Sequence, residues 1–204
     1  VEADTTTEWF RTPLKTPVFA SGISYLTELS PHPIVEVARG VGKAGSCLAV
    51  GVQGVVGFPD QLKAACETGT PVIQIIKPLA DEDVVYGWLE RAEAHGCMAV
   101  GMDLISCTGT EIERRQRSRI PVEVKTREQL RDYISSTSLP FLVKGVLSVE
   151  DAVQAQSLGA AGVIVSNLGG WALGSAVHAL EVLPDIRSAV GSRFPIFADG
   201  GFLR

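Results

Sequence analysis

The sequence lacks several features that would define other classes of protein. It has no basic cluster, and 18 Lys and Arg against 23 Asp and Glu give a net charge of −5, so a nucleic-acid partner is not expected. No apolar run approaches the ~18 residues of a membrane helix, and the polar, acidic N-terminal stretch is not a secretory signal. The four cysteines form no CxxC pair and show no metal-ligand spacing. We therefore expect a cytoplasmic chain with reduced thiols, no metal site and no membrane partner.

What the sequence does contain is enough apolar material for one substantial core. Hydrophobic residues make up 46% of the 204 residues, and nothing marks a second domain, so we predict a single domain over 1–204. Short apolar runs recur, each suited to a buried parallel strand and most followed by a stretch with helical periodicity. These seven runs are residues 17–20, 47–51, 72–76, 98–102, 140–143, 162–165 and 195–198.

Helix signals fall between these runs. Asp81 begins a stretch whose apolar residues, Val84 among them, share one face. Ser148 and Asp151 form a capping-box pattern before a helix that Gly159 ends, and a third helix is predicted over 175–190. Alternating strands and helices with short Gly and Pro joints predict an α/β fold.

The alternation fits either a doubly wound sheet or a (β/α)8 barrel of the TIM type. No GxGxxG follows the first strand, and three strands end in a chemically active residue, namely Lys144, Ser166 and Asp199. Active residues at several strand ends are typical of the barrel, whose sites lie at the C-terminal face of the strands. A complete barrel needs ~250 residues, so we expect about seven βα units with the eighth missing. That implies truncation at the C-terminus, and the start at Val1 leaves truncation at the N-terminus open.

The stretch from Leu139 to Gly201 carries a specific likeness. It reads LPFLVKGVLSVEDAVQAQSLGAAGVIVSNLGG and closes on FPIFADGG. This stretch resembles the FMN-dependent 2-hydroxy acid oxidase and dehydrogenase family, which includes glycolate oxidase and flavin-type lactate and mandelate dehydrogenases. The likeness continues less densely back to residue 17. It implies a TIM barrel, FMN as cofactor, a small-molecule substrate, and hydride transfer from a hydroxylated carbon to flavin N5.

The resemblance assigns Lys144 to the family's lysine beside flavin N1. A fixed ammonium there stabilises the anionic reduced flavin, so Lys144 is the predicted catalytic residue as well as a cofactor contact. Gln74 matches the glutamine that hydrogen-bonds the flavin pyrimidine ring. The segment PVFASGI supplies Ala20 and Ser21 as two more predicted cofactor contacts.

The remaining predicted FMN contacts lie at the ends of the last two strands. Ser166 and Asn167 match the first two residues of the family's SNHGG motif, and Ser166 is predicted to contact the cofactor. Asp199, Gly200 and Gly201 match its DGG motif. Glycines there allow backbone N–H groups to approach the FMN phosphate.

The substrate half of the family's site is altered. The histidine that acts as base is Leu168 in this chain, and the carboxylate-binding arginine is Trp171. Neither residue can accept a proton or pair with an anion. A family tyrosine and a family threonine are replaced by Ile76 and Gly101. We therefore expect a substrate other than a simple 2-hydroxy acid.

Other titratable residues offer weaker candidates. Asp103 ends a strand on the same rim and could form a carboxylate pair with Asp199, although a structural hydrogen-bonding role is the favoured interpretation. His32 and His95 are interpreted as helix-terminal residues, and His178 as a helix-surface or packing residue.

Three functions stay open on the sequence. The first is an FMN-dependent oxidoreductase acting on a CH–OH group, and the second is a catalytically inactive barrel fragment or scaffold. The third is a flavin-dependent isomerase on the same barrel, because residues 49–53 resemble the second strand of the type 2 isopentenyl diphosphate isomerase. A homo-oligomer is also left open.

Overall fold

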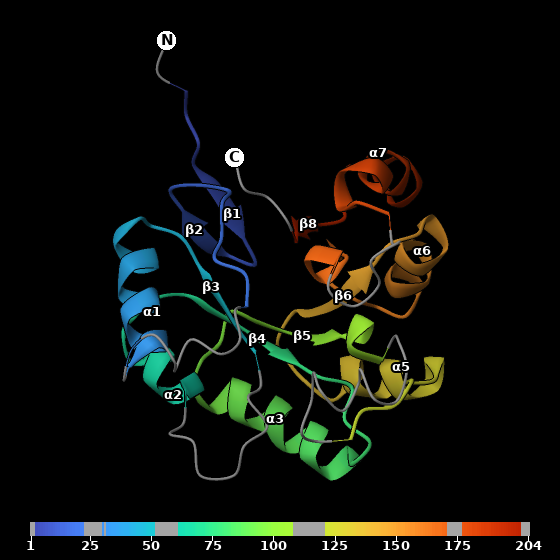
Figure 1. Ribbon diagram of the computed structural model, residues 1–204, viewed down its shortest axis with the longest axis horizontal. Coiled ribbons are helices and arrows are strands. Elements are labelled where there is room, and N and C mark those ends of the chain that lie inside the picture. Colours follow the sequence, from blue (N-terminus) through green and yellow to red (C-terminus); the bar gives the residue numbers. More distant parts are fainter. Residues whose placement is uncertain are drawn as a thin grey trace.

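Six parallel strands form one curled sheet at the centre of the molecule. A computed structural model describes residues 3–22, 30, 32–51, 61–107, 121–170 and 177–200. Within these residues the strand order is β3-β4-β5-β6-β7-β8, so each strand pairs with the next one along the chain. The strands are β3 (Leu48–Gly51), β4 (Val72–Ile76), β5 (Ala99–Asp103), β6 (Phe141–Val146), β7 (Gly162–Ser166) and β8 (Ile196–Asp199). The arrangement is a partial (β/α) barrel, which confirms the predicted fold class (Figure 1).

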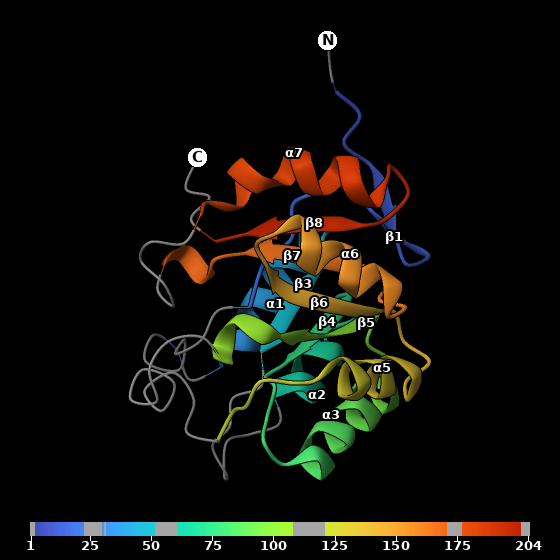
Figure 2. The ribbon, with the colours of Figure 1, turned by 90° about the vertical axis from the view of Figure 1, so that its right-hand side faces the viewer.

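Helices pack against the outer face of this sheet (Figure 2). They are α1 (Pro33–Lys43), α2 (Gln61–Cys66), α3 (Glu82–Ala94), α5 (Arg127–Ser135), α6 (Val149–Ser157) and α7 (Ala179–Val190), with the short 3₁₀ helices η2 (Leu104–Cys107) and η3 (Leu168–Gly170). Local hydrogen bonds fix where several of them begin. The Asp81 carboxylate accepts from the backbone N–H groups of Asp83 and Val84, and Ser148 Oγ accepts from Asp151 N. No helix among the described residues is long and apolar enough to cross a membrane.

Most predicted elements are present, with three corrections. The run at 17–20 forms only a single bridge, in which Ala20 pairs with Leu48, because side chains occupy the Val18 backbone: its N–H donates to Thr16 Oγ1 and its carbonyl accepts from Ser46 Oγ. The last helix begins at Ala179, well after the predicted residue 175. Val84 is 36% exposed and does not share the buried face of α3.

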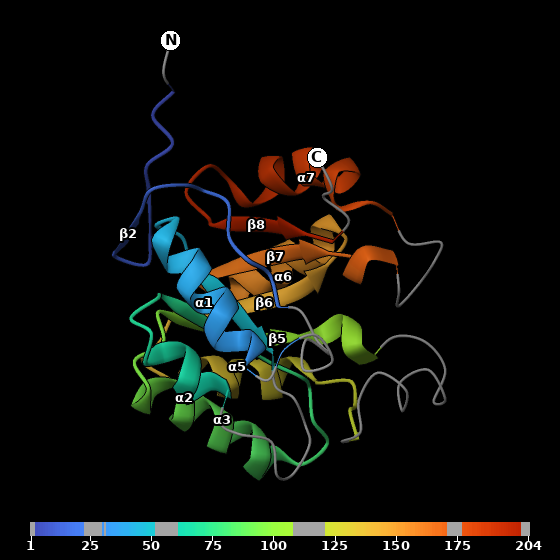
Figure 3. The same cartoon turned by 60° about the vertical axis from the view of Figure 1, so that its left-hand side comes forward.

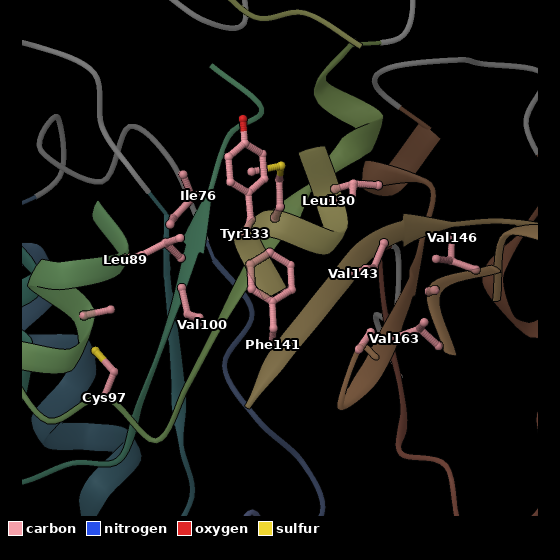
Figure 4. Close-up of a cluster of buried hydrophobic side chains, with 14 of the residues drawn as sticks. Ile76, Leu89, Cys97, Val100, Leu130, Tyr133, Phe141, Val143, Val146 and Val163 are labelled. Atoms are coloured by element: carbon pink, nitrogen blue, oxygen red, sulfur yellow. The ribbon is translucent and has the colours of Figure 1, made fainter. Parts of the chain in front are cut away.

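The alternation of side chains along each strand divides the apolar core into two layers. The outer layer lies between sheet and helices and includes Val100, Phe141 and Tyr133, as Figure 4 shows. The inner layer lies on the concave face and includes Ile73, Ala99, Leu142, Ile164 and Phe197. This inner layer is the packed interior of the barrel.

An N-terminal hairpin packs against that inner layer. Its strands are β1 (Thr7–Trp9) and β2 (Thr12–Leu14), joined by Phe10 and Arg11 at φ 48° and 64°. The Trp9 ring meets the Phe197 ring edge-on, with centroids 4.7 Å apart. This hairpin was not predicted from the sequence, because positive φ at both loop positions normally selects Asn and Gly.

Candidate functional site

Polar side chains gather where the strands of the barrel end. Lys144 on β6 pairs in register with Asp103 on β5, and Ser166 on β7 pairs with Asp199 on β8. Each lies two or four residues along its strand from a residue of the inner apolar layer, so all four point to the same concave face. Figure 3 shows β7 and β8 ending on the side of the molecule that carries η3. The structure therefore brings together at one rim the three strand-end residues that the sequence predicted.

Lys144 is at the centre of this group. Its Nζ donates to Ser166 Oγ at 2.7 Å and to the two carboxylate oxygens of Asp199 at 3.0 and 2.7 Å. Lys144 is 5% exposed and Asp199 is 8% exposed, so the ion pair is shielded from water. An ammonium group has three N–H bonds, and all three have acceptors here. Ser166 Oγ also accepts from Leu168 N at 3.2 Å, which ties η3 to the lysine.

The N-terminal segment completes the group from the other edge of the sheet. Ser21 Oγ donates a hydrogen bond to Asp199 Oδ2. Ala20, immediately before it, pairs with Leu48 of β3 through Ala20 N to Cys47 O at 3.1 Å and Ala49 N to Ala20 O at 2.8 Å. Asp199 therefore links the first and last strand positions of the partial barrel, which lie 178 residues apart in sequence.

Asp103 is the most unusual carboxyl group of the rim. Burial raises its pKa, the charge of Asp199 raises it further, and Lys144, Lys77 and the Ile105 backbone N–H oppose the shift. Its Oδ1 has no hydrogen-bond partner among the described residues. A buried carboxyl without full partners holds its proton more readily than an exposed one, so Asp103 is a candidate proton-transfer group.

Replacement of Asp103 with Asn should have a pH-dependent effect on stability. Because the folded-state pKa is raised, the protonated form of Asp103 stabilises the fold at low pH, and that contribution is lost as the pH rises through the folded pKa. Asn has no charged form, so Asp103→Asn should be more stable relative to the parent chain at pH 8 than at pH 4. Thermal unfolding of both proteins at pH 4 and pH 8 measures the stability difference between variant and parent. The same stability difference at both pH values would contradict the raised pKa.

Gln74 does not join the group at the rim. It alternates with Ile73 and Ile75 of the inner layer and so lies on the helix-covered face. Its amide donates to Val50 O at 3.0 Å and to Ile75 O at 3.1 Å, while its Oε1 has no partner among the described residues. Its predicted contact with a flavin stays a prediction.

The loop after β8 packs closely on the loop after β7. Gly200 has φ +90°, and a Cβ at this position would lie 2.9 Å from Gly169 N and 3.0 Å from Asn167 Oδ1. A glycine is therefore required here. Asn167 donates to Val177 O at 3.2 Å, and its Oδ1 is buried without a hydrogen bond in the described part of the chain. Asn167 and Asp103 were not among the predicted cofactor contacts, although Asn167 matches the second residue of the SNHGG motif and Asp103 lies at a strand end.

Two positions named in the sequence analysis, Gly201 and Trp171, lie outside the described residues. Leu168, which stands where the family has its histidine, is described and adopts φ 55° at the start of η3.

The three histidines lie at helix ends. His178 is the N-cap of α7 and forms a capping box with Glu181, so its expected place within the helix is wrong. His95 is the C-cap of α3 and His32 the N-cap residue of α1, as the helix-terminal interpretation predicted. None of them lies on a strand end of the barrel rim.

The fold and rim define a class: a parallel (β/α) barrel with a buried lysine–carboxylate pair at the C-terminal ends of its strands. Comparison with known proteins agrees. The model of the FMN-dependent dehydrogenase family matches residues 1–135 and again 113–204. An L-lactate oxidase of Lentilactobacillus hilgardii is 27% identical over 97% of this chain and 61% of its own length, and an L-lactate oxidase of Alicycliphilus denitrificans is 50% identical over 36% of this chain and 20% of its own.

Solved structures show the same relationship. A mandelate oxidase variant with a monooxide FMN adduct superposes with a TM-score of 0.84 at 26% identity, over 97% of this chain and 62% of the oxidase. Nearly the whole of this chain aligns with the Lentilactobacillus lactate oxidase and with the mandelate oxidase, and it spans about three fifths of the length of each. It belongs to the FMN-dependent dehydrogenase family.

Proposed function

We propose that this chain binds FMN at the C-terminal rim of its barrel and serves in the oxidation of a CH–OH group on a small molecule. The observation that carries the proposal is the buried ammonium group of Lys144, held on the concave face by Ser166 and Asp199. Family membership and the FMN adduct in a related mandelate oxidase support FMN as the cofactor.

The described residues fit such a cofactor. Lys144 provides a buried cation, Gly200 brings backbone close to η3, and Asn167 Oδ1 and Asp103 Oδ1 are buried without hydrogen bonds in the described part. Bound FMN would supply an acceptor for the two electrons removed from the substrate carbon. Since all three N–H bonds of Lys144 are used, a flavin atom would have to replace one of its present acceptors. Ser21 and Ser166 would keep the carboxylate and ammonium groups oriented during that exchange.

Proton removal from the substrate hydroxyl requires a base. Leu168 has no titratable group, so we propose Asp103 for this role, on the support of its burial, its raised pKa and its position beside Lys144. An apolar residue at position 168 also favours a more apolar substrate than lactate or glycolate.

We further propose a cytoplasmic location, because the four cysteines are free thiols in the structure. A homo-oligomer stays a prediction.

FMN titration of the purified chain tests the proposal. The parent chain should retain flavin absorbance after desalting, and Lys144→Met should bind FMN about 10- to 100-fold more weakly, because a charge-assisted hydrogen bond is lost. Lys63→Met is the matched control, since Lys63 is an exposed residue of α2 whose Nζ lies 3.8 Å from a carboxylate oxygen of Glu67, just after that helix. Circular dichroism must show that both variants are folded.

Anaerobic mixing with substrates separates catalysis from binding. Bleaching of bound flavin by apolar hydroxy compounds or by 2-hydroxy acids would support an oxidoreductase. Retained flavin that no hydroxy compound reduces would favour the second candidate, a flavin-binding protein without turnover. The observation behind this candidate is Leu168, which has no titratable group at the position of the family's base. A parent chain that binds no FMN would contradict both.

A further inference from the structure

Two cysteines that are distant in sequence meet at the opposite end of the barrel from Lys144. Cys66 is the last residue of α2, and Cys97 lies in the joint between α3 and β5. Their Sγ atoms are 3.9 Å apart. Neither Cys47 nor Cys107 is part of this pair. The sequence contains four cysteines with no pairing pattern, and the fold brings two of them, Cys66 and Cys97, into contact.

The backbone on both sides of this pair is held by hydrogen bonds. Cys97 N donates to Ala92 O at 3.0 Å, and Met98 N donates to Val72 O at 2.8 Å. Cys66 O accepts from Gly69 N at 3.0 Å. A disulfide requires an S–S distance of about 2.05 Å, so the sulfurs must approach by roughly 2 Å. Because the backbone is held, rotation about the two Cα–Cβ bonds would supply this movement.

The two thiols differ in environment. Cys97 is 4% exposed within the outer apolar layer, beside α3 as Figure 4 shows, whereas Cys66 is half-buried at the margin of that layer. The contact with Cys66 and burial both raise the pKa of Cys97. Cys97 therefore holds its proton more readily than an exposed thiol does, and Cys66 is the sulfur nearer to solvent and to an entering oxidant.

We propose that Cys66 and Cys97 form an oxidation site that takes hydroperoxides and closes to an intramolecular disulfide. The Cys66 thiolate attacks the peroxide, the O–O bond breaks, and Cys66 becomes a sulfenic acid while the peroxide leaves as an alcohol or water. The Cys97 sulfur then attacks the Cys66 sulfur, the S–O bond breaks, and the departing hydroxide takes the Cys97 proton to form water. Two thiols are oxidised, and one peroxide is reduced. The bond would join α2 to the start of β5.

Thiol counting after oxidation tests this inference independently of FMN binding. The purified chain is treated with hydrogen peroxide, unfolded, alkylated with N-ethylmaleimide and measured by intact mass and peptide mapping. We expect two of the four thiols to escape alkylation, a peptide link between Cys66 and Cys97, and reversal by dithiothreitol. Thermal unfolding should shift upward by about 5–10 °C in the oxidised form, because the bond restricts the unfolded chain.

Two cysteine variants test whether the disulfide forms specifically between Cys66 and Cys97. Cys107→Ser is the matched control and should still form the link, because Cys107 donates to Glu123 O at 2.8 Å, away from the pair. Cys66→Ser should abolish it. Four alkylated thiols after oxidation, a link through Cys107, a link between two chains, or overoxidised Cys66 without a link would each refute the proposal, and the parent chain alone decides this if Cys66→Ser fails to fold.

Discussion

Replacement of Lys144 with Met should destabilise the fold by about 3–5 kcal/mol, because it leaves the Asp199 carboxylate buried without its cation. Asp199 is 8% exposed, and its oxygens accept from Lys144 at 3.0 and 2.7 Å. Ser21 alone would remain to donate to it among the bonds described here. Asp199→Asn should be destabilising for the converse reason, since the ammonium group would lose its partner.

The double variant is the decisive part of this experiment. In Lys144→Met with Asp199→Asn neither buried charge remains, so its loss of stability should be smaller than the sum of the two single losses. Urea unfolding of the parent, the two single variants and the double variant gives the four free energies of unfolding. If the single losses add without interaction, the ion pair contributes nothing to stability, and the arrangement of the rim must be explained otherwise.

Phe197→Ala should cost about 3–5 kcal/mol of unfolding free energy, through lost burial and the cavity left behind. Phe197 is the β8 residue of the inner layer and contacts three rings, those of Trp9, Phe10 and Phe19. The substitution therefore removes the main attachment of the N-terminal hairpin to the interior of the barrel. Thermal and urea unfolding followed by circular dichroism measure the loss.

Val18→Ala is the control for this substitution. Val18 lies in the same N-terminal segment as Phe19 but is 70% exposed, so its truncation should change stability by less than about 0.5 kcal/mol. Equal losses for the two variants would show that the aromatic contacts do not hold the hairpin in place. A small loss for Phe197→Ala alone would show that the interior refills after truncation.

The sequence predicted the parallel strands well because each is a short apolar run between turn residues. A strand buried on both faces needs apolar side chains at every position, and this pattern is local. The helix that follows Ser148 was also predicted, since a cap and a C-terminal glycine are local signals. The hairpin was missed because Phe10 and Arg11 adopt positive φ without the usual turn residues.

The sequence by itself determined the class of the fold, the family and the strand-end positions of Lys144, Ser166 and Asp199, because all of these depend on residue type and short-range order. Only the tertiary structure decided which side chains meet. The curl of the sheet placed Ser21 against Asp199, left Asp103 buried beside Lys144, and brought Cys66 within reach of Cys97. The physical reason is that such contacts join residues distant in the chain, and their distances depend on the curvature and register of the whole sheet.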